Sequence, residues 1–162
     1  MSTEQQAENF SWSPDGKRVA YSAGSGGLQT ILVVPADGSG PAETVLPAAA
    51  DFRRVDGWTL DGKSLVIERL DSQTQWDLWV LPLEGDRQPR PYLRRPRERG
   101  SAAVSPDGRW LCYNSDESGR NEGYVQSFPT PGPRFQVTTD GTGVFGWKRD
   151  GAALALGQTP NS

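Results

Sequence analysis

The residues that most often carry enzyme chemistry are scarce in this sequence. It contains no histidine and a single cysteine, Cys112, among 162 residues. Serine and cysteine nucleophiles usually need a histidine base, so Ser-His-Asp and Cys-His systems are excluded. Zinc sites built from histidines or several thiolates are excluded for the same reason. The acidic loop at 116–122 does not match the spacing of a known metal loop. We therefore predict no catalytic residue, no metal site and no cofactor.

Aspartate is the one chemically active residue that recurs at a fixed spacing. Four of the Asp-Gly pairs, which begin at Asp15, Asp61, Asp107 and Asp150, recur with spacings of 46, 46 and 43 residues. Asp-Gly between two apolar runs predicts a hairpin, because the tight turn needs a positive φ that glycine tolerates. The short aspartate side chain can also bond to nearby backbone amides. We interpret the four aspartates as turn residues and not as catalytic acids.

The Asp-Gly pairs belong to a repeat of apolar runs. In each unit one short run precedes the pair, a second follows it at once, and in the complete units two more follow after a Gly-rich or acidic loop. The second run, as at 64–67, is apolar at successive positions, which is typical of a strand covered on both faces. Four strands in roughly 45 residues form one β-propeller blade. We predict an all-β fold, a β-propeller of four-stranded antiparallel blades.

The repeat count leaves the propeller incomplete. The units are predicted at 10–47, 51–95, 101–139 and 143–157, after a disordered lead at 1–9 and before a tail at 158–162. The fourth unit contains only half of the expected strands, so about three and a half blades are present. A propeller that does not close leaves unpaired strand edges. We therefore expect either a piece of a longer propeller or self-association into a homo-oligomer that closes the ring.

One carboxylate breaks the register of the repeat. Asp56 lies where the other units place an apolar residue such as Phe10. Local rules tend to fail at functional sites, and the first strand of a propeller blade lines the central channel, where Asp56 could face a ligand. The interpretation we favour is a local bulge that turns Asp56 to solvent beside Arg53 or Arg54. Glycoside hydrolases need two carboxylates, so a carboxylate-based glycoside hydrolase centred on Asp56 is the alternative function.

Arginines gather in one segment. Six of them lie from Arg87 to Arg99. Together with Arg53 and Arg54 they could form a basic patch on one rim that attracts phosphate or carboxylate groups. The alternative is that long arginine stems protect an outer edge strand from unwanted pairing. Arg53, Arg54, Asp56 and Arg99 are the candidate binding residues.

The repeat resembles a known family. The sequence Trp-Ser-Pro-Asp-Gly-Lys-Arg-Val-Ala-Tyr at 12–21, followed by Ile-Leu-Val-Val-Pro-Ala-Asp-Gly at 31–38, resembles the TolB-type repeat, also called PD40 or WD40-like, and the match recurs over 10–157. The stretches 115–129 and 147–151 are similar to the propeller region of bacterial transmembrane Ser/Thr kinases. These resemblances imply a non-catalytic binding, scaffold or sensor module for a protein or small ligand, within a periplasmic or extracytoplasmic parent. The same repeat precedes the hydrolase domain of prolyl-oligopeptidase-like peptidases, so a hydrolase-associated fragment is a further alternative.

Charge and hydropathy limit the classes of partner that we expect for this chain. The formal net charge is −3, whereas general nucleic-acid binders are usually basic, so we expect no nucleic-acid partner. No apolar run approaches the length of a membrane span, so we expect no membrane segment in this chain. Cys112 lies in register with Ala20 and Val66, which predicts a small buried apolar residue and not a reactive thiol.

Overall fold

The structure is a computed structural model that describes residues 6–25, 28–49, 51, 53–94, 102–148 and 154–157. The described residues form three four-stranded sheets and one two-stranded sheet, and every strand pair is antiparallel. Within each sheet the strands follow chain order, as in a series of hairpins. This confirms the predicted propeller of four-stranded antiparallel blades. The described part of the chain contains no helix long and apolar enough to cross a membrane.

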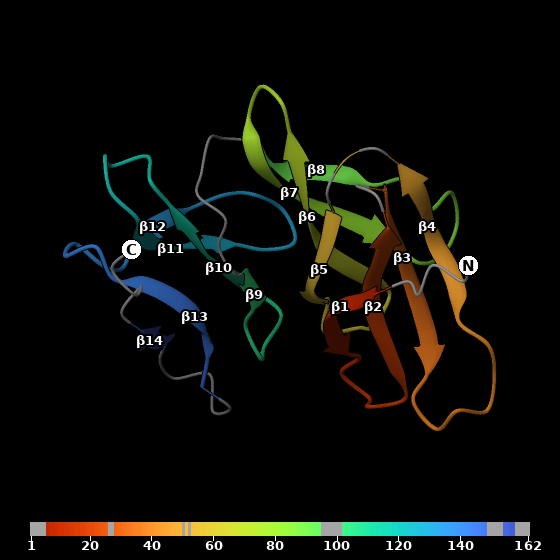
Figure 1. The fold of residues 1–162 in the computed structure, drawn as a ribbon. Helices are drawn as coiled ribbons and strands as arrows, with labels where there is room; N and C mark the ends of the chain where they lie inside the picture. The colour runs from red at the N-terminus through yellow and green to blue at the C-terminus, as the bar shows by residue number, and fades with distance from the viewer. Residues whose placement is uncertain are drawn as a thin grey trace.

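Each sheet is one blade, numbered in chain order. Blade 1 comprises β1 (Gln6–Trp12), β2 (Arg18–Ser25), β3 (Leu28–Pro35) and β4 (Glu43–Ala49). Blade 2 comprises β5 (Arg53–Trp58), β6 (Ser64–Asp71), β7 (Gln75–Pro82) and β8 (Arg90–Leu93). Blade 3 comprises β9 (Ala103–Val104), β10 (Trp110–Ser115), β11 (Glu122–Ser127) and β12 (Arg134–Gln136), and half-blade 4 comprises β13 (Gly143–Trp147) and β14 (Leu154–Gly157). The first strands β1, β5 and β9 lie toward the middle of the molecule, and β4, β8 and β12 lie at its periphery (Figure 1).

Blade 1 begins earlier than the sequence analysis predicted. Residues 6–9, predicted as disordered lead, belong to β1, and residues 6–8 pair with β2, with Gln6 opposite Gly24. A polar segment can extend a strand because its hydrogen bonds come from the backbone and not from its side chains. Strand β4 also runs to Ala49, past the predicted unit end at residue 47. Residues 1–5 and the predicted tail at 158–162 lie outside the described residues.

The Asp-Gly turns have the predicted structure. The turn glycines have positive φ, with +69° at Gly16, +67° at Gly62 and +73° at Gly108. In blade 3, the Asp107 carboxylate accepts hydrogen bonds from the Ser105 hydroxyl at 2.6 Å and the Arg109 amide at 3.1 Å. These bonds, that from Ser105 first, lower the pKa of Asp107 to about 2. Blades 1 and 2 repeat both bonds, whereas Asp150 lies outside the described residues.

The hydrophobic core lies between successive blades. In β6, Leu65 and Ile67 pack against blade 1 and Val66 packs toward blade 3, and each is at most 1% exposed. This confirms that a strand with successive apolar residues is covered on both faces. In blade 3, Cys112 occupies the register of Val66 and is fully buried, as predicted. Burial raises the pKa of the Cys112 thiol to about 12, so the thiol is protonated at neutral pH.

Candidate functional site

The antiparallel blades place their connections on two opposite rims. The turns between the first and second strands and between the third and fourth strands form one rim, which we call the Asp-Gly rim. The other rim holds the loops between the second and third strands and the connections between blades, and we call it the loop rim. The candidate residues Arg53, Arg54 and Asp56 lie on β5, at or close behind its start on the loop rim.

Arg54 joins two carboxylates in a buried cluster. Its Nε lies 2.6 Å from Oε2 of Glu68, the cross-strand partner of Arg54 on β6, and 3.2 Å from Oδ1 of Asp56. The side chains of Arg54, Asp56 and Glu68 are 12%, 5% and 0% exposed. Buried charges persist in a protein only when they are paired and hydrogen-bonded. The Arg54 cluster (Arg54, Asp56 and Glu68) therefore holds its acids in structural ion pairs.

The bulge expected at Asp56 is present, but its side chain does not turn to solvent. The pairing of β5 with β6 shifts between Val55 and Gly57, so that Asp56 is the extra residue. A β-bulge re-aims the side chain of the extra residue, and here it aims Asp56 at Arg54. Because the ion pair holds the carboxylate, the side chain stays 5% exposed. The equivalent bulge in β1 instead leaves Phe10 70% exposed.

A second cluster occupies the other face of the same strands. The Asp51 carboxylate contacts Nε of Arg53 at 2.7 Å through one oxygen and Nε of Arg69 through the other. Arg53 and Arg69 are cross-strand neighbours, and like charges directly opposite each other destabilise a sheet. Asp51 offsets this repulsion. The Asp51 cluster (Asp51, Arg53 and Arg69) thus fastens the connection from blade 1 to the start of blade 2.

The predicted basic patch is divided between the two rims. Arg87 pairs with Glu43 of blade 1 at 2.5 Å, beside the Glu84-Gly85 turn that leads into β8. Arg90, at the start of β8, pairs with Asp86 in that turn. Both arginines therefore lie on the Asp-Gly rim, opposite to Arg53, because β8 carries the chain from one rim to the other. Arg95, Arg97 and the candidate residue Arg99 lie outside the described residues.

On the loop rim, two arginines flank one tryptophan. The guanidinium carbons of Arg69 and Arg94 lie 5.1 Å and 5.0 Å from the ring centroid of Trp79. Both distances are within the range of cation–π contacts. Arg69 is 37% exposed and Arg94 is exposed. This rim of blade 2 therefore presents Arg94 to solvent with Arg69 partly exposed beside it, while Arg54, Asp56 and Glu68 are buried on the other face of β5 and β6.

The sequence analysis missed a column of buried polar residues on the second strand of each complete blade. Ser22, Glu68 and Asn114 occupy the same register and are at most 3% exposed. Ser22 donates to the carbonyl of Glu8 at 3.0 Å, and Asn114 bonds both the amide and the carbonyl of Val144 in half-blade 4. A signal was present, because a polar residue follows the apolar run at this spacing in each complete unit.

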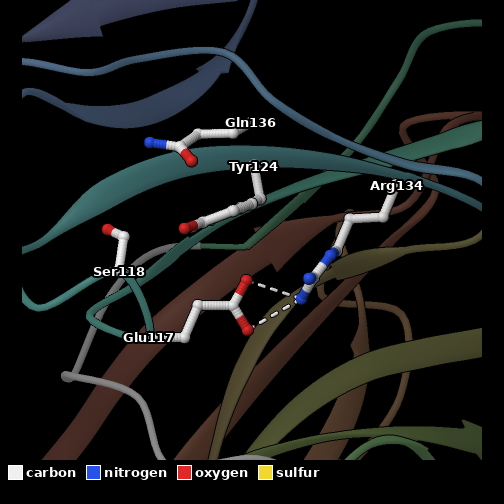
Figure 2. Close-up of a pocket in the computed structure, with 5 residues that line it drawn as sticks. All are labelled: Glu117, Ser118, Tyr124, Arg134 and Gln136. Carbon is white, nitrogen blue, oxygen red and sulfur yellow. Dashed lines mark hydrogen bonds and ion pairs between the residues drawn. The ribbon is translucent and has the colours of Figure 1, made fainter.

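A pocket opens on the outer part of blade 3, close to the loop rim. It has a volume of about 540 Å³ and is lined by Glu117, Ser118, Tyr124, Arg134 and Gln136. Figure 2 shows Glu117 and Arg134 pointing toward each other, with Nη1 of Arg134 at 2.6 Å and 2.7 Å from the two carboxylate oxygens. The Arg134 guanidinium also lies 5.3 Å from the Tyr124 ring centroid. With its charges paired, the pocket suits a neutral polar group.

The acids of these sites are engaged with other groups of the chain. In the described residues, the acids that could act as a general acid or base are engaged with arginines, hydroxyls or backbone amides at the sites discussed above. Within the same described ranges, no three histidine, cysteine, aspartate or glutamate side chains lie close enough together to hold a metal ion. The arginines on Trp79 and the polar pocket are the charged and polar features of the loop rim that reach its surface.

Comparison with known proteins identifies the fold. No family model matches the sequence. Tricorn protease homolog 1 of Streptomyces coelicolor is 33% identical over 75 residues, which are 45% of this chain and 7% of that protein. The TolB structure from Acinetobacter baumannii superposes with a TM-score of 0.79 at 21% identity, covering 96% of this chain and 38% of that one. A chain of the Nidogen/Laminin complex gives a TM-score of 0.69 at 15% identity, covering 94% of this chain and 56% of that one.

The fold and the repeats define this chain as a β-propeller, built of blades that are stacked side by side around a centre. More particularly, the propeller is TolB-like, as the repeat sequence predicted. The chain spans less than two thirds of the length of the proteins to which it is similar. The narrower resemblance to kinase-linked propellers stays a prediction.

Proposed function

We propose that the chain is a non-catalytic binding module that recognises an acidic segment of a partner protein on the loop rim of blade 2. The single observation that carries this proposal is the pair of arginines on Trp79, of which Arg94 is exposed and Arg69 is 37% exposed. Stacking on an aromatic ring orients a guanidinium, and an oriented guanidinium binds a carboxylate with two parallel hydrogen bonds.

The exposed side of this rim supports an acidic partner. Four arginines, Arg53, Arg54, Arg69 and Arg94, lie there with five carboxylates, Asp51, Asp56, Glu68, Asp71 and Asp77. Three of the acids pair with arginines of the rim, and Asp71 and Asp77 accept hydrogen bonds from the Gln73 amide and the Thr74 hydroxyl. Arg94 is the exposed member of the four arginines, and an exposed guanidinium can pair with a carboxylate of a partner. The Nidogen/Laminin complex includes a propeller-like chain within a protein assembly, which supports a protein partner.

The test is peptide binding, measured by fluorescence polarisation with acidic, neutral and basic peptide panels. The wild-type chain should prefer acidic peptides. The double variant R69A/R94A should weaken their binding by about tenfold, because each charge-assisted hydrogen bond contributes about 1.5–3 kcal/mol. The matched control is R87A/R90A, which removes the same charge from the Asp-Gly rim. Equal weakening by the two double variants, or no preference for acidic peptides, would contradict the proposal.

A second candidate is a propeller segment within a larger protease assembly, which the similarity to Tricorn protease homolog 1 favours. In that setting the propeller would still supply no catalytic group. The glycoside hydrolase alternative is disfavoured because Arg54 engages Asp56 and Glu68 together. Hydrolysis of a glycoside panel by the wild-type chain, lost in Asp56→Asn with the fold retained, would revive that alternative.

A further inference from the structure

The pocket of blade 3 lies on the face of that blade that packs against blade 2. Tyr124 on β11 is directly opposite Tyr113 on β10 and Gln136 on β12, so the three side chains share one face of the sheet. Tyr113 and Tyr124 belong to the core that also contains Leu78 and Leu93 of blade 2. The two tyrosine rings are stacked, with their centroids 5.9 Å apart. The pocket therefore rests on a buried and closely packed base.

The Tyr124 hydroxyl is a buried polar group that the fold itself does not use. The residue is 3% exposed and lines the pocket, and Figure 2 shows its hydroxyl end pointing toward Ser118. Among the described residues this hydroxyl makes no hydrogen bond, whereas the Tyr113 hydroxyl donates to Oε1 of Gln126 at 3.3 Å. Buried polar groups are nearly always hydrogen-bonded. A hydroxyl without a partner at the wall of a pocket is therefore available to a ligand.

Two further side chains of the pocket are polar and are held in place. The Gln136 amide donates to the Thr138 carbonyl at 2.8 Å, and the Ser118 hydroxyl donates to the Arg120 carbonyl at 3.2 Å. The Gln136 amide still has a second N–H and a carbonyl oxygen to offer, and the Ser118 hydroxyl can still accept. No aliphatic side chain is among the described residues that line the pocket. The walls thus offer donors and acceptors, and little apolar contact.

Glu117 and Arg134 decide which charge the pocket accepts. They are paired with each other, and their side chains remain 21% and 32% exposed. A carboxylate can only accept hydrogen bonds and a guanidinium can only donate them. A ligand group that both donates and accepts can bond to both members of the pair. Because the two charges cancel, such a ligand should itself be neutral.

We propose that this pocket binds a neutral sugar unit of a glycan. Every sugar hydroxyl both donates and accepts, so neighbouring hydroxyls of one ring match the mixture of groups on the pocket walls. The volume of about 540 Å³ lies within the range of about 300–1,000 Å³ that is usual for ligand pockets. A peptide is usually recognised through pockets for its apolar side chains, which these walls do not provide. The pocket contains none of the arginines on Trp79, so this proposal does not depend on the proposed function.

The test is binding of the full chain to an array of neutral glycans built from glucose, galactose, mannose and N-acetylglucosamine. Isothermal titration calorimetry then follows with the trisaccharide that the array ranks first. Tyr124→Phe removes only the hydroxyl and should weaken binding about fivefold. Gln136→Ala, at an exposed position of β12, should weaken binding by a similar factor. Tyr21→Phe on β2 of blade 1 is the matched control and should leave binding unchanged.

A charge variant tests why the ligand should be neutral. Glu117→Gln removes the partner of Arg134 and leaves the guanidinium charge unpaired. Relative to the neutral trisaccharide, a trisaccharide that ends in a uronic acid should therefore gain affinity about tenfold in this variant. The wild-type chain should prefer the neutral form. R69A/R94A should bind the neutral trisaccharide as the wild type does, which separates this test from that of the proposed function.

Each outcome decides the proposal. Binding of a neutral trisaccharide that weakens in Tyr124→Phe and Gln136→Ala, but not in Tyr21→Phe, supports it. No binding to any glycan of the array at millimolar concentration overturns it, as does equal binding by all variants. Displacement of the trisaccharide by an uncharged Gly-Ser peptide would make the pocket a peptide site and also overturns it. If Tyr124→Phe does not fold, Gln136→Ala and Glu117→Gln decide in its place.

Discussion

The two joints between complete blades are built differently. Between blades 1 and 2, the contact is centred on Trp58, whose indole binds the carbonyl of Ser11 on the first strand of blade 1. The Arg18 guanidinium lies 4.8 Å from the centroid of the Trp58 ring and donates to the carbonyl of Gly62 at 2.7 Å. This joint is fastened at the inner strands and at the Asp-Gly rim.

Between blades 2 and 3, the contact moves outward. Val104 occupies the register of Trp58 and has no N–H donor in its side chain. Instead, the Tyr92 hydroxyl on the outermost strand of blade 2 donates to the carbonyl of Ser127 at 2.6 Å. Its ring lies 5.4 Å from that of Phe128. This joint is therefore fastened at the periphery by an aromatic pair.

The difference shows that the repeat specifies the blade but not the joint. Each blade needs its turns and its apolar strands, so these recur in every complete unit. A joint needs only one well-placed aromatic donor and an acceptor in the facing blade, and either the inner or the outer strand can supply them. Substitutions at Trp58 and Tyr92 should distinguish the two types of joint.

The largest effect is expected from Trp58→Ala. Truncating a buried tryptophan removes apolar contacts and leaves a cavity, which costs about 3–5 kcal/mol. The carbonyl of Ser11 also loses its side-chain donor. The free energy of unfolding in urea measures the loss. Trp12→Ala is the matched control, and because Trp12 is 61% exposed its cost should be below about 1 kcal/mol. Equal losses would show that Trp58 does not fasten the joint.

A smaller effect is expected from Tyr92→Phe. The ring contact with Phe128 stays, and only the hydrogen bond to Ser127 is lost, which costs about 1 kcal/mol. Burial raises the pKa of Tyr92, so its hydroxyl remains a donor at neutral pH. Tyr92→Leu also removes the aromatic contact and should destabilise the chain further in the same urea titration. If Tyr92→Phe costs nothing, the outer hydrogen bond has no part in the joint.

The smallest effect is expected in the Asp-Gly turns, which recur in the blades on both sides of each joint. Ser105→Ala removes the donor that contributes most to the low pKa of Asp107, about 2 against an ordinary 3.8. Because the pKa is lower in the folded state, the carboxylate stabilises the fold above pH 3.8, and this contribution is lost as the pH falls from there toward 2. In Ser105→Ala the pKa of Asp107 should rise toward 3.8, as followed by NMR titration. An unchanged pKa would assign the shift to the Arg109 contacts.

How much of the site could be predicted depended on whether its geometry is local. The turn role of Asp107 followed from its neighbours, since its partners lie two residues away on either side. The bulge at Asp56 was also anticipated. Its burial was not, because Glu68, the second acid on Arg54, comes from another strand. The sequence analysis grouped Arg87 and Arg53 in one basic patch, yet β8 and its turn place them on opposite rims.

The sequence by itself determined the strands, the Asp-Gly turns and the four-stranded blade, because each depends on residues close together in the chain. The glycines of the turns and the apolar runs of the strands carry that information locally. Only the tertiary structure decided which charges pair, which rim an arginine occupies and which tryptophan is covered. Trp12 and Trp58 lie at equivalent places in the same repeat, and they differ because blade 1 packs on Trp58 while no described sheet packs on Trp12. Burial depends on the neighbouring blade, and no local pattern contains that neighbour.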